Sequence, residues 1–164
     1  MSKSFTLIEI IVAMFLLTVG AGAAFGVIQT TIELTSAASN QLVASYLAQE
    51  GVELIRNIRD GNYLKQRTDP ETSWDRAIYI GSDYRLDYQS DSFPDIACNL
   101  GIGNFLKFNG EFYNCFDGEE TKFKRKITVE KPEEDTIKII VEVSWTEFGR
   151  PYQVAVQTNL SNWR

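Results

Sequence analysis

One carboxylate stands alone at the start of a long apolar segment. Glu9 follows Lys3, Ser4 and Phe5 closely and precedes the run from Ile10 to Ile32, which contains no charged residue. An ionised acid costs about 2.5–3.5 kcal/mol at the centre of a bilayer and less toward its edge. Glu9 is therefore expected either to lie in the headgroup region or to pair with a cation, and the pairing would make it a functional residue.

The apolar run is longer than the roughly 20 residues that a helix needs to cross a bilayer. Lys3 on the short N-terminal side and Glu33 after the run predict an N-terminus inside and the bulk of the chain outside. A secretory signal peptide is the alternative, because Ala21, Ala23 and Ala24 resemble a small-residue cleavage site. Its apolar core, however, is typically only about 7–15 residues long.

Three glycines, Gly20, Gly22 and Gly26, lie within the predicted spanning helix. Gly22 and Gly26 have the small-xxx-small spacing that permits close approach of two helices. Each glycine also weakens the helix by roughly 0.5–1 kcal/mol relative to alanine, and such flexibility would suit a helix that has to change its surroundings. Glycine is also simply common in membrane helices, so both interpretations stay open.

Residues 4–9, with the sequence SFTLIE, lead into this apolar helix and resemble the N-terminus of type IV prepilins and type II secretion pseudopilins. The resemblance implies that a prepilin peptidase cuts between Ser4 and Phe5 and that the new Phe5 amine is methylated. It also implies that Glu9 pairs with the terminal amine of a neighbouring subunit. The family usually has glycine before the cut, where this chain has the similarly small Ser4.

Cleavage after Ser4 would give Phe5 a free ammonium. An ammonium and a carboxylate attract strongly at low dielectric, and each offsets the desolvation of the other. Phe5 and Glu9 lie four residues apart, which allows a pair within one helix. A pair between staggered parallel helices is equally consistent with the sequence.

Helical spacing continues beyond the apolar run, and no proline occurs between Ser4 and Arg67. We expect one helix from about Thr6 to Arg59, ending at the polar stretch 60–62, with a second half that is amphipathic. Its apolar stripe comprises Leu34, Ala38, Leu42, Ser45, Ala48, Val52, Ile55 and Ile58.

Strict alternation marks three strands near the C-terminus, at 123–130, 136–145 and 152–160. Short links predict an antiparallel meander, whose apolar face needs a cover that the amphipathic half of the helix supplies. The predicted fold is therefore α+β and pilin-like: a long N-terminal helix, membrane-spanning in its first half, packed on a C-terminal antiparallel β-meander.

This organisation predicts a leader at 1–4, a transmembrane and assembly helix at 5–32 and an extracytoplasmic domain at 33–164. Residues 60–104 are less regular, with short strands expected at Ala77–Ile80 and Tyr84–Tyr88.

The cysteines are Cys98 and Cys115, and outside the cytosol such a pair in a loop-rich region indicates a disulfide. Two free buried thiols are the alternative. The bridge would clamp a hairpin of 105–108 and 111–113, whose Asn109-Gly110 pair predicts a two-residue turn.

Composition excludes several functions. The chain has 16 basic and 22 acidic residues and no histidine, which removes the commonest general base and zinc ligand. A net charge of −6 argues against generic nucleic-acid binding, although Lys122, Lys124, Arg125 and Lys126 form a possible local basic patch. Asp83, Asp87, Asp91 and Asp95, or Asp117, Glu119 and Glu120, offer oxygen ligands for calcium, but a solvated acidic surface is the favoured interpretation.

The sequence thus favours a structural filament subunit of the cytoplasmic membrane and cell surface, with no catalytic residues, cofactor, metal or small-molecule substrate. Its expected partners are like or related pilin subunits, prepilin peptidase and the membrane, with no nucleic acid. The alternatives are a single-pass anchored binding module that does not polymerise and, less favoured, an anchored enzyme.

Overall fold

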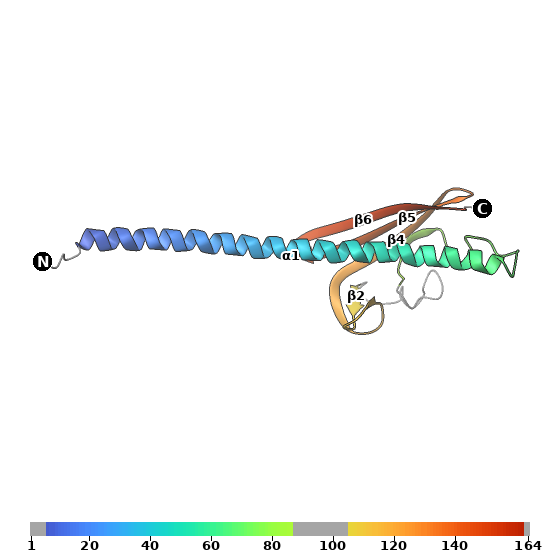
Figure 1. Cartoon of the computed structure of the whole chain (residues 1–164), viewed down its shortest axis with the longest axis horizontal. Coiled ribbons are helices and arrows are strands. Elements are labelled where there is room, and N and C mark those ends of the chain that lie inside the picture. The colour runs from blue at the N-terminus through green and yellow to red at the C-terminus, as the bar shows by residue number, and fades with distance from the viewer. Residues whose placement is uncertain (1–5, 87–104, 163–164) are drawn as a thin grey trace. The chain divides into compact units, whose positions relative to one another are not determined.

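The computed structural model describes residues 6–86 and 105–162. The chain forms two compact units, Met1–Asn40 and Gln41–Arg164. A single long helix, α1 (Leu7–Gln66), begins in the first unit and ends in the second (Figure 1).

In the first unit, every described residue from Thr6 to Thr35 is exposed, including its apolar side chains. By length and composition, α1 qualifies to cross a membrane. Thr18, Thr30 and Thr31 each donate their hydroxyl to a backbone carbonyl three or four residues earlier in the helix. Because these hydroxyls are satisfied within the helix, they are compatible with an apolar solvent.

The second unit contains a six-stranded antiparallel sheet with the order β3-β2-β4-β5-β6, and β1 pairs with β4 beside this path. The strands are β1 (Gly81–Tyr84), β2 (Phe105–Phe108), β3 (Tyr113–Asn114), β4 (Glu119–Glu133), β5 (Thr136–Glu147) and β6 (Arg150–Ser161). The last three strands form the predicted meander, and their tight turns contain Glu134-Asp135 and Phe148-Gly149.

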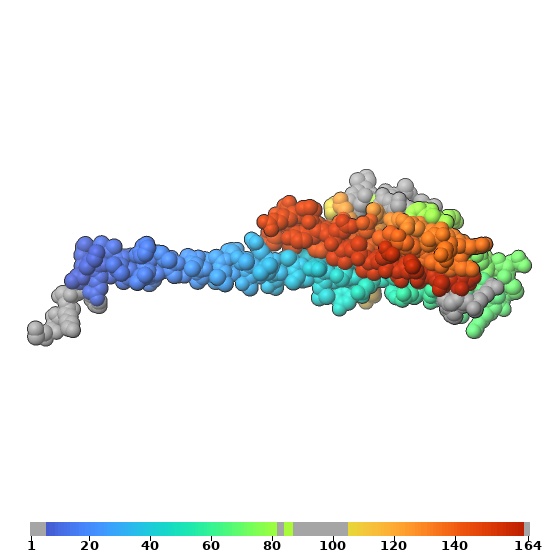
Figure 2. Space-filling model, turned by 90° about the horizontal axis from the view of Figure 1, so that it is seen from above, coloured from blue at the N-terminus to red at the C-terminus, as the bar shows by residue number. Residues whose placement is uncertain are grey.

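The sheet is covered on one face by the second part of α1, and Figure 2 shows β5 and β6, in orange and red, lying along it. The core-facing residues of β5 alternate along the strand and are almost fully buried: Ile137, Ile139, Val141, Val143 and Trp145. From the helix, the core contains Ala44, Leu47, Ala48, Val52 and Ile55. The α+β, pilin-like architecture predicted from periodicity is therefore confirmed.

The helix stripe was predicted only in part. Ala48, Val52 and Ile55 are buried, but Leu42 is 56% exposed and Leu34 is exposed as well. Ala44 and Leu47 take part in the core instead, because the buried face of the helix begins at Ala44 and runs through Leu47 and Ala48.

The predicted helix stop was wrong, because α1 continues through Asp60-Gly61-Asn62 to Gln66. The buried Asn62 amide donates to the carbonyls of Trp74 and Arg76, at 3.0 and 2.7 Å. Gln66 likewise donates to the carbonyl of Thr72. These polar side chains therefore attach the following segment to the last turns of the helix instead of ending it.

Two further local predictions need correction. Ala77–Ile80 is not a strand, because Ala77 adopts a left-handed φ of 62° and β1 begins only at Gly81. Of the predicted strand Tyr84–Tyr88, the structure describes residues 84–86, and only Tyr84 belongs to β1. The predicted hairpin exists, but Phe108 pairs with Tyr113 and leaves a four-residue connection. The Asn109 side chain accepts hydrogen bonds from the backbone N–H groups of residues 111 and 112, which stabilises this longer loop.

Close packing between helix and sheet centres on Gly51 and Arg125. A Cβ added at Gly51 would lie 2.8 Å from Val141 Cγ1, so the helix approaches the sheet too closely there for any side chain. Arg125 is 2% exposed, pairs with Glu50 at 3.1 Å and donates to the carbonyls of Leu47 and Leu86. Arg125 therefore belongs to the core face and not to the predicted basic patch.

Candidate assembly site at the start of the long helix

The candidate assembly site lies at the first turn of α1. The Thr6 hydroxyl accepts a hydrogen bond from the backbone N–H of Glu9 at 3.3 Å, and the Thr6 carbonyl accepts from Glu9 and Ile10. Thr6 thus caps the helix, whose first residue is Leu7. The sequence analysis did not use this cap, although Thr6-x-x-Glu9 is a typical helix-start pattern.

Glu9 is exposed and lies in the first helical turn, where the positive end of the helix dipole favours a carboxylate. This effect typically contributes 0.3–1 kcal/mol. Within the described part of the chain, no cation lies at ion-pair distance from its carboxylate. The helix start therefore presents an exposed acid in its first turn.

Ser4 and Phe5, the predicted cleavage and methylation residues, lie outside the described residues. Cleavage between them and the pairing of Phe5 with Glu9 therefore stay predictions. The packing role of the glycines also stays a prediction, because a Cβ at Gly20, Gly22 or Gly26 would meet nothing within 4 Å. Nothing among the described residues thus requires glycine at these positions.

The surface around the first turn is strongly apolar. Leu7, Ile8, Ile11 and Phe15 each expose more than half of their accessible area. Buried apolar surface stabilises association by roughly 25 cal/mol per Å², so this helix gains from lipid or from neighbouring helices. It offers a long packing surface with one acid at its beginning.

In the predicted cysteine clamp, Cys115 directly follows β3 and is not a free thiol. Its expected partner, Cys98, lies outside the described residues, so the pairing stays a prediction. In the described part of the chain, no three His, Cys, Asp or Glu residues gather closely enough to hold a metal ion. The calcium alternatives at Asp87, Asp91 and Asp95 fall outside that part.

The shifted carboxyl groups belong to the second unit. Burial acts to raise the pKa of Asp75, but hydrogen bonds from Lys131 and Ser73 and the charge of Lys131 outweigh it and leave the pKa below its usual value. A hydrogen bond and ion pair with Lys126 lower the pKa of Glu142. Each acid faces its own lysine, which indicates structural ion pairs and not a catalytic group.

Comparison with known proteins agrees with the helix start described above. Residues 1–25 match the family described as "Prokaryotic N-terminal methylation motif". No curated protein and no solved structure matches the chain. The motif suggests a structural protein, and it implies processing by prepilin peptidase and assembly with other pilins in general. Together with the exposed apolar helix, it fits a membrane-anchored protein of extracellular filaments. The chain therefore begins with the type IV prepilin-like signal, and this signal precedes a pilin-like α+β fold.

Proposed function

We propose that this chain is a structural subunit of a type IV pilus or of a related secretion or DNA-uptake filament, assembled through the first part of α1. One observation carries the proposal: a methylation motif adjoins a helix whose apolar residues are all exposed up to Leu34. Such a surface has to be covered by lipid before assembly and by neighbouring helices after it.

Assembly would use one charge pair and many apolar contacts. Hydrolysis of the Ser4–Phe5 bond frees an amine on Phe5, and methylation leaves that amine basic and cationic. The Glu9 carboxylate compensates this charge in an environment where neither group has water. Because the same contact recurs at every subunit, a small energy per pair is repeated along the filament.

Placement in the membrane follows from charge. Lys3 stays on the cytoplasmic side of the inner membrane, and the sheet lies outside. After assembly the second unit becomes the outer surface of the filament. A bitopic binding module that does not polymerise is the competing function, and it shares the anchor but needs neither the cut nor Glu9.

The test uses the full chain in cells with a functional prepilin peptidase and filament machinery. Mass spectrometry of the N-terminus and electron microscopy of the surface are compared for the parent chain, Glu9→Gln and Glu33→Gln. Glu9→Gln preserves size and removes the charge, and Glu33 is a second exposed glutamate on the same helix.

We expect a methylated Phe5 terminus, filaments from the parent and from Glu33→Gln, and at least tenfold fewer filaments from Glu9→Gln. A tenfold loss corresponds to about 1.4 kcal/mol. Normal filaments from Glu9→Gln would remove the pairing mechanism. An intact Met1 together with a permanently monomeric protein would favour the bitopic module.

A further inference from the structure

The two turns of the meander expose opposite chemistry. The β4–β5 turn carries Glu134 and Asp135, and both are exposed. The β5–β6 turn carries Phe148 and Gly149 and is followed by Arg150, and all three are exposed. Phe148 leaves 64% of its accessible area open to the surroundings. One turn is therefore acidic, whereas the other presents an aromatic ring beside a cation.

The backbone of the β5–β6 turn does not explain its phenylalanine. Phe148 and Gly149 both adopt positive φ, at 48° and 74°, as in the type I′ turns that join antiparallel strands. Such turns favour Asn-Gly, Asp-Gly or Gly-Gly, because bulky residues rarely adopt a left-handed backbone. Phe148 therefore suits neither its own backbone nor the core, and its role is expected in a contact outside the chain.

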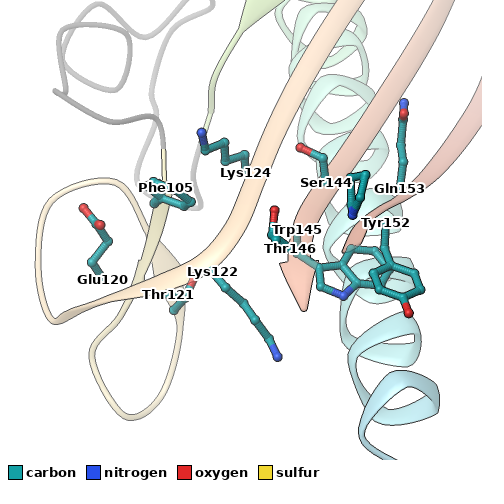
Figure 3. Close-up of a pocket in the computed structure, with 11 residues that line it drawn as sticks. Phe105, Glu120, Thr121, Lys122, Lys124, Ser144, Trp145, Thr146, Tyr152 and Gln153 are labelled. Atoms are coloured by element: carbon teal, nitrogen blue, oxygen red, sulfur yellow. The ribbon is translucent and has the colours of Figure 1, made fainter. Parts of the chain in front are cut away.

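The two strands that lead to this turn hold it firmly. Trp145 lies directly opposite Tyr152, and their rings stack with centroids 5.4 Å apart. Figure 3 shows the two rings side by side, next to the hollow where β4 parts from β5. Pairing of β5 with β6 continues from these rings to the turn without a shift of register. Phe148 is thus presented by an ordered hairpin end, which reduces the entropy lost on binding.

The β5–β6 turn lies at the end of the second unit where the chain enters it. Gly51 approaches Val141 within β5, whereas Tyr63, later in the helix, donates to Asn162 beside the start of β5. The helix therefore runs antiparallel to β5. The seven residues from Val141 to Phe148 extend roughly 24 Å toward the beginning of the second unit. Because the predicted membrane-spanning segment precedes this end in the chain, the aromatic turn belongs to the side nearer the membrane.

We propose that Phe148 inserts its ring into the outer headgroup region of the membrane, with Arg150 beside lipid phosphates, while the subunit is anchored there before assembly. Aromatic and basic side chains are typical of such interfacial contacts. Arg150 forms no ion pair within the described part of the chain. The neighbouring Glu147 does not oppose the contact, because it is 8% exposed and pairs with Lys122. This inference rests on the membrane-anchored stage of the proposed function and adds a second lipid contact to that of the helix.

The small size of this surface favours lipid over a protein partner. A stable protein interface covers about 800 Å² on each partner, whereas one aromatic side chain buries about 150–250 Å². A lipid contact can be this small, because the anchored helix keeps the turn at a high effective concentration near the membrane. Exposed acids at the same end of the sheet belong to the β2–β3 hairpin and the start of β4: Glu111, Asp117, Glu119 and Glu120. These acids favour water, so the contact is confined to the β5–β6 turn.

The test uses the full chain in vesicles of phosphatidylethanolamine and phosphatidylglycerol. A photoreactive benzoylphenylalanine is placed at position 148 or at position 79, and mass spectrometry distinguishes lipid adducts from protein adducts. Tyr79 is the matched control, because it is aromatic, 57% exposed and close to β1, which pairs with β4 in the half of the sheet nearer the acidic turn. We expect at least tenfold more lipid adduct at position 148 than at position 79.

Hydrogen exchange of residues 146–151 in the same vesicles is a second measurement, which needs no label. After correction for intrinsic rates, we expect the parent and Phe148→Leu to exchange at least threefold more slowly than Phe148→Asn. Asparagine suits a left-handed turn position, so Phe148→Asn should keep or raise the midpoint of urea unfolding. Faster exchange in a variant that is no less stable then reports a lost lipid contact and not unfolding.

Equal lipid adducts at positions 148 and 79 would overturn the lipid contact, and so would adducts of position 148 with protein in place of lipid. Equal exchange in Phe148→Leu and Phe148→Asn would overturn it as well. If the chain still resides in the membrane fraction and forms filaments that depend on Glu9, these results leave the proposed function standing. A chain that is absent from the membrane fraction would overturn both.

Discussion

The two parts of α1 have the same secondary structure and opposite surroundings. From Leu7 to Leu34 every side chain is exposed, whereas from Ala44 to Asn62 one stripe is buried in the second unit. The first part has no protein partner within the described chain, and its threonines turn their hydroxyls onto the helix backbone. The second part is held by a sheet, a buried arginine and a glycine contact. The comparison shows that the first part suits an apolar environment, which the described residues do not supply.

The largest expected effect compares Ile55→Ala with Ile11→Ala. Ile55 is completely buried and Ile11 is 54% exposed. Truncation of a buried isoleucine costs about 2–5 kcal/mol, so Ile55→Ala should destabilise the second unit by that amount and Ile11→Ala by close to nothing. Urea unfolding in detergent, followed by tryptophan fluorescence, measures this difference, because all three tryptophans follow Asn40.

Ile55→Ala and Ile11→Ala also distinguish the two parts of α1 when filament formation is measured. If the first part of α1 becomes a core on assembly, Ile11→Ala should weaken filaments while leaving the unfolding curve of the single chain unchanged. Equal unfolding losses for both variants would show that the two parts are not energetically distinct.

A smaller effect is expected at the glycines. At Gly51 a methyl group would lie 2.8 Å from Val141, and overpacking of this kind costs about 1–3 kcal/mol. The better helix propensity of alanine offsets up to about 1 kcal/mol of that cost. Gly51→Ala should therefore destabilise the second unit by about 1–2 kcal/mol, measured by the same urea unfolding.

Gly22→Ala is the matched control, because a Cβ there meets nothing within 4 Å. It should leave the single chain unchanged and affect only the assembled state, where close helix approach would need a small residue. A Gly51→Ala variant as stable as the parent would mean that the helix can move away from Val141 at little cost.

Periodicity predicted the parts of the fold that follow from local pattern. The alternation of Ile137, Ile139 and Val141 predicted their burial, and the spacing of Val52 and Ile55 predicted the helix face that covers them. The candidate site followed from a short motif, since SFTLIE and an apolar run are both readable from the chain.

Contacts between distant residues were not predictable in this way. Arg125 has lysines on both sides in sequence, but the pleat turns it inward, where it meets Glu50 from a remote helix. The helix continues through the predicted stop at 60–62, where the Asn62 side chain donates to carbonyls in the 74–76 segment. The predicted strand at Ala77 is missing because of a single left-handed φ. In each case a tertiary contact or one backbone angle overrides a local propensity.

The smallest expected effect concerns charge and pH. The stretch of α1 from Ile10 to Ile32 carries no charge, so the contribution of that stretch should not change with pH. The second unit, in contrast, depends on pairs such as Asp75–Lys131, 2.7 Å apart. Because the pKa of Asp75 is lowered on folding, its pair stabilises the protein above the ordinary pKa of 3.8. That stabilisation is lost as the pH falls through the lower folded value.

Asp75→Asn should therefore cost about 1 kcal/mol at neutral pH, in the range of partly exposed ion pairs. The urea unfolding curves of the parent and of Asp75→Asn should converge as the pH falls below about 4. Glu53→Gln, which removes a more exposed pair with Arg56, should cost less at every pH. A constant difference between parent and Asp75→Asn from pH 7 to 3 would show that Asp75 acts through neutral hydrogen bonds, such as that from Ser73, and not through its charge.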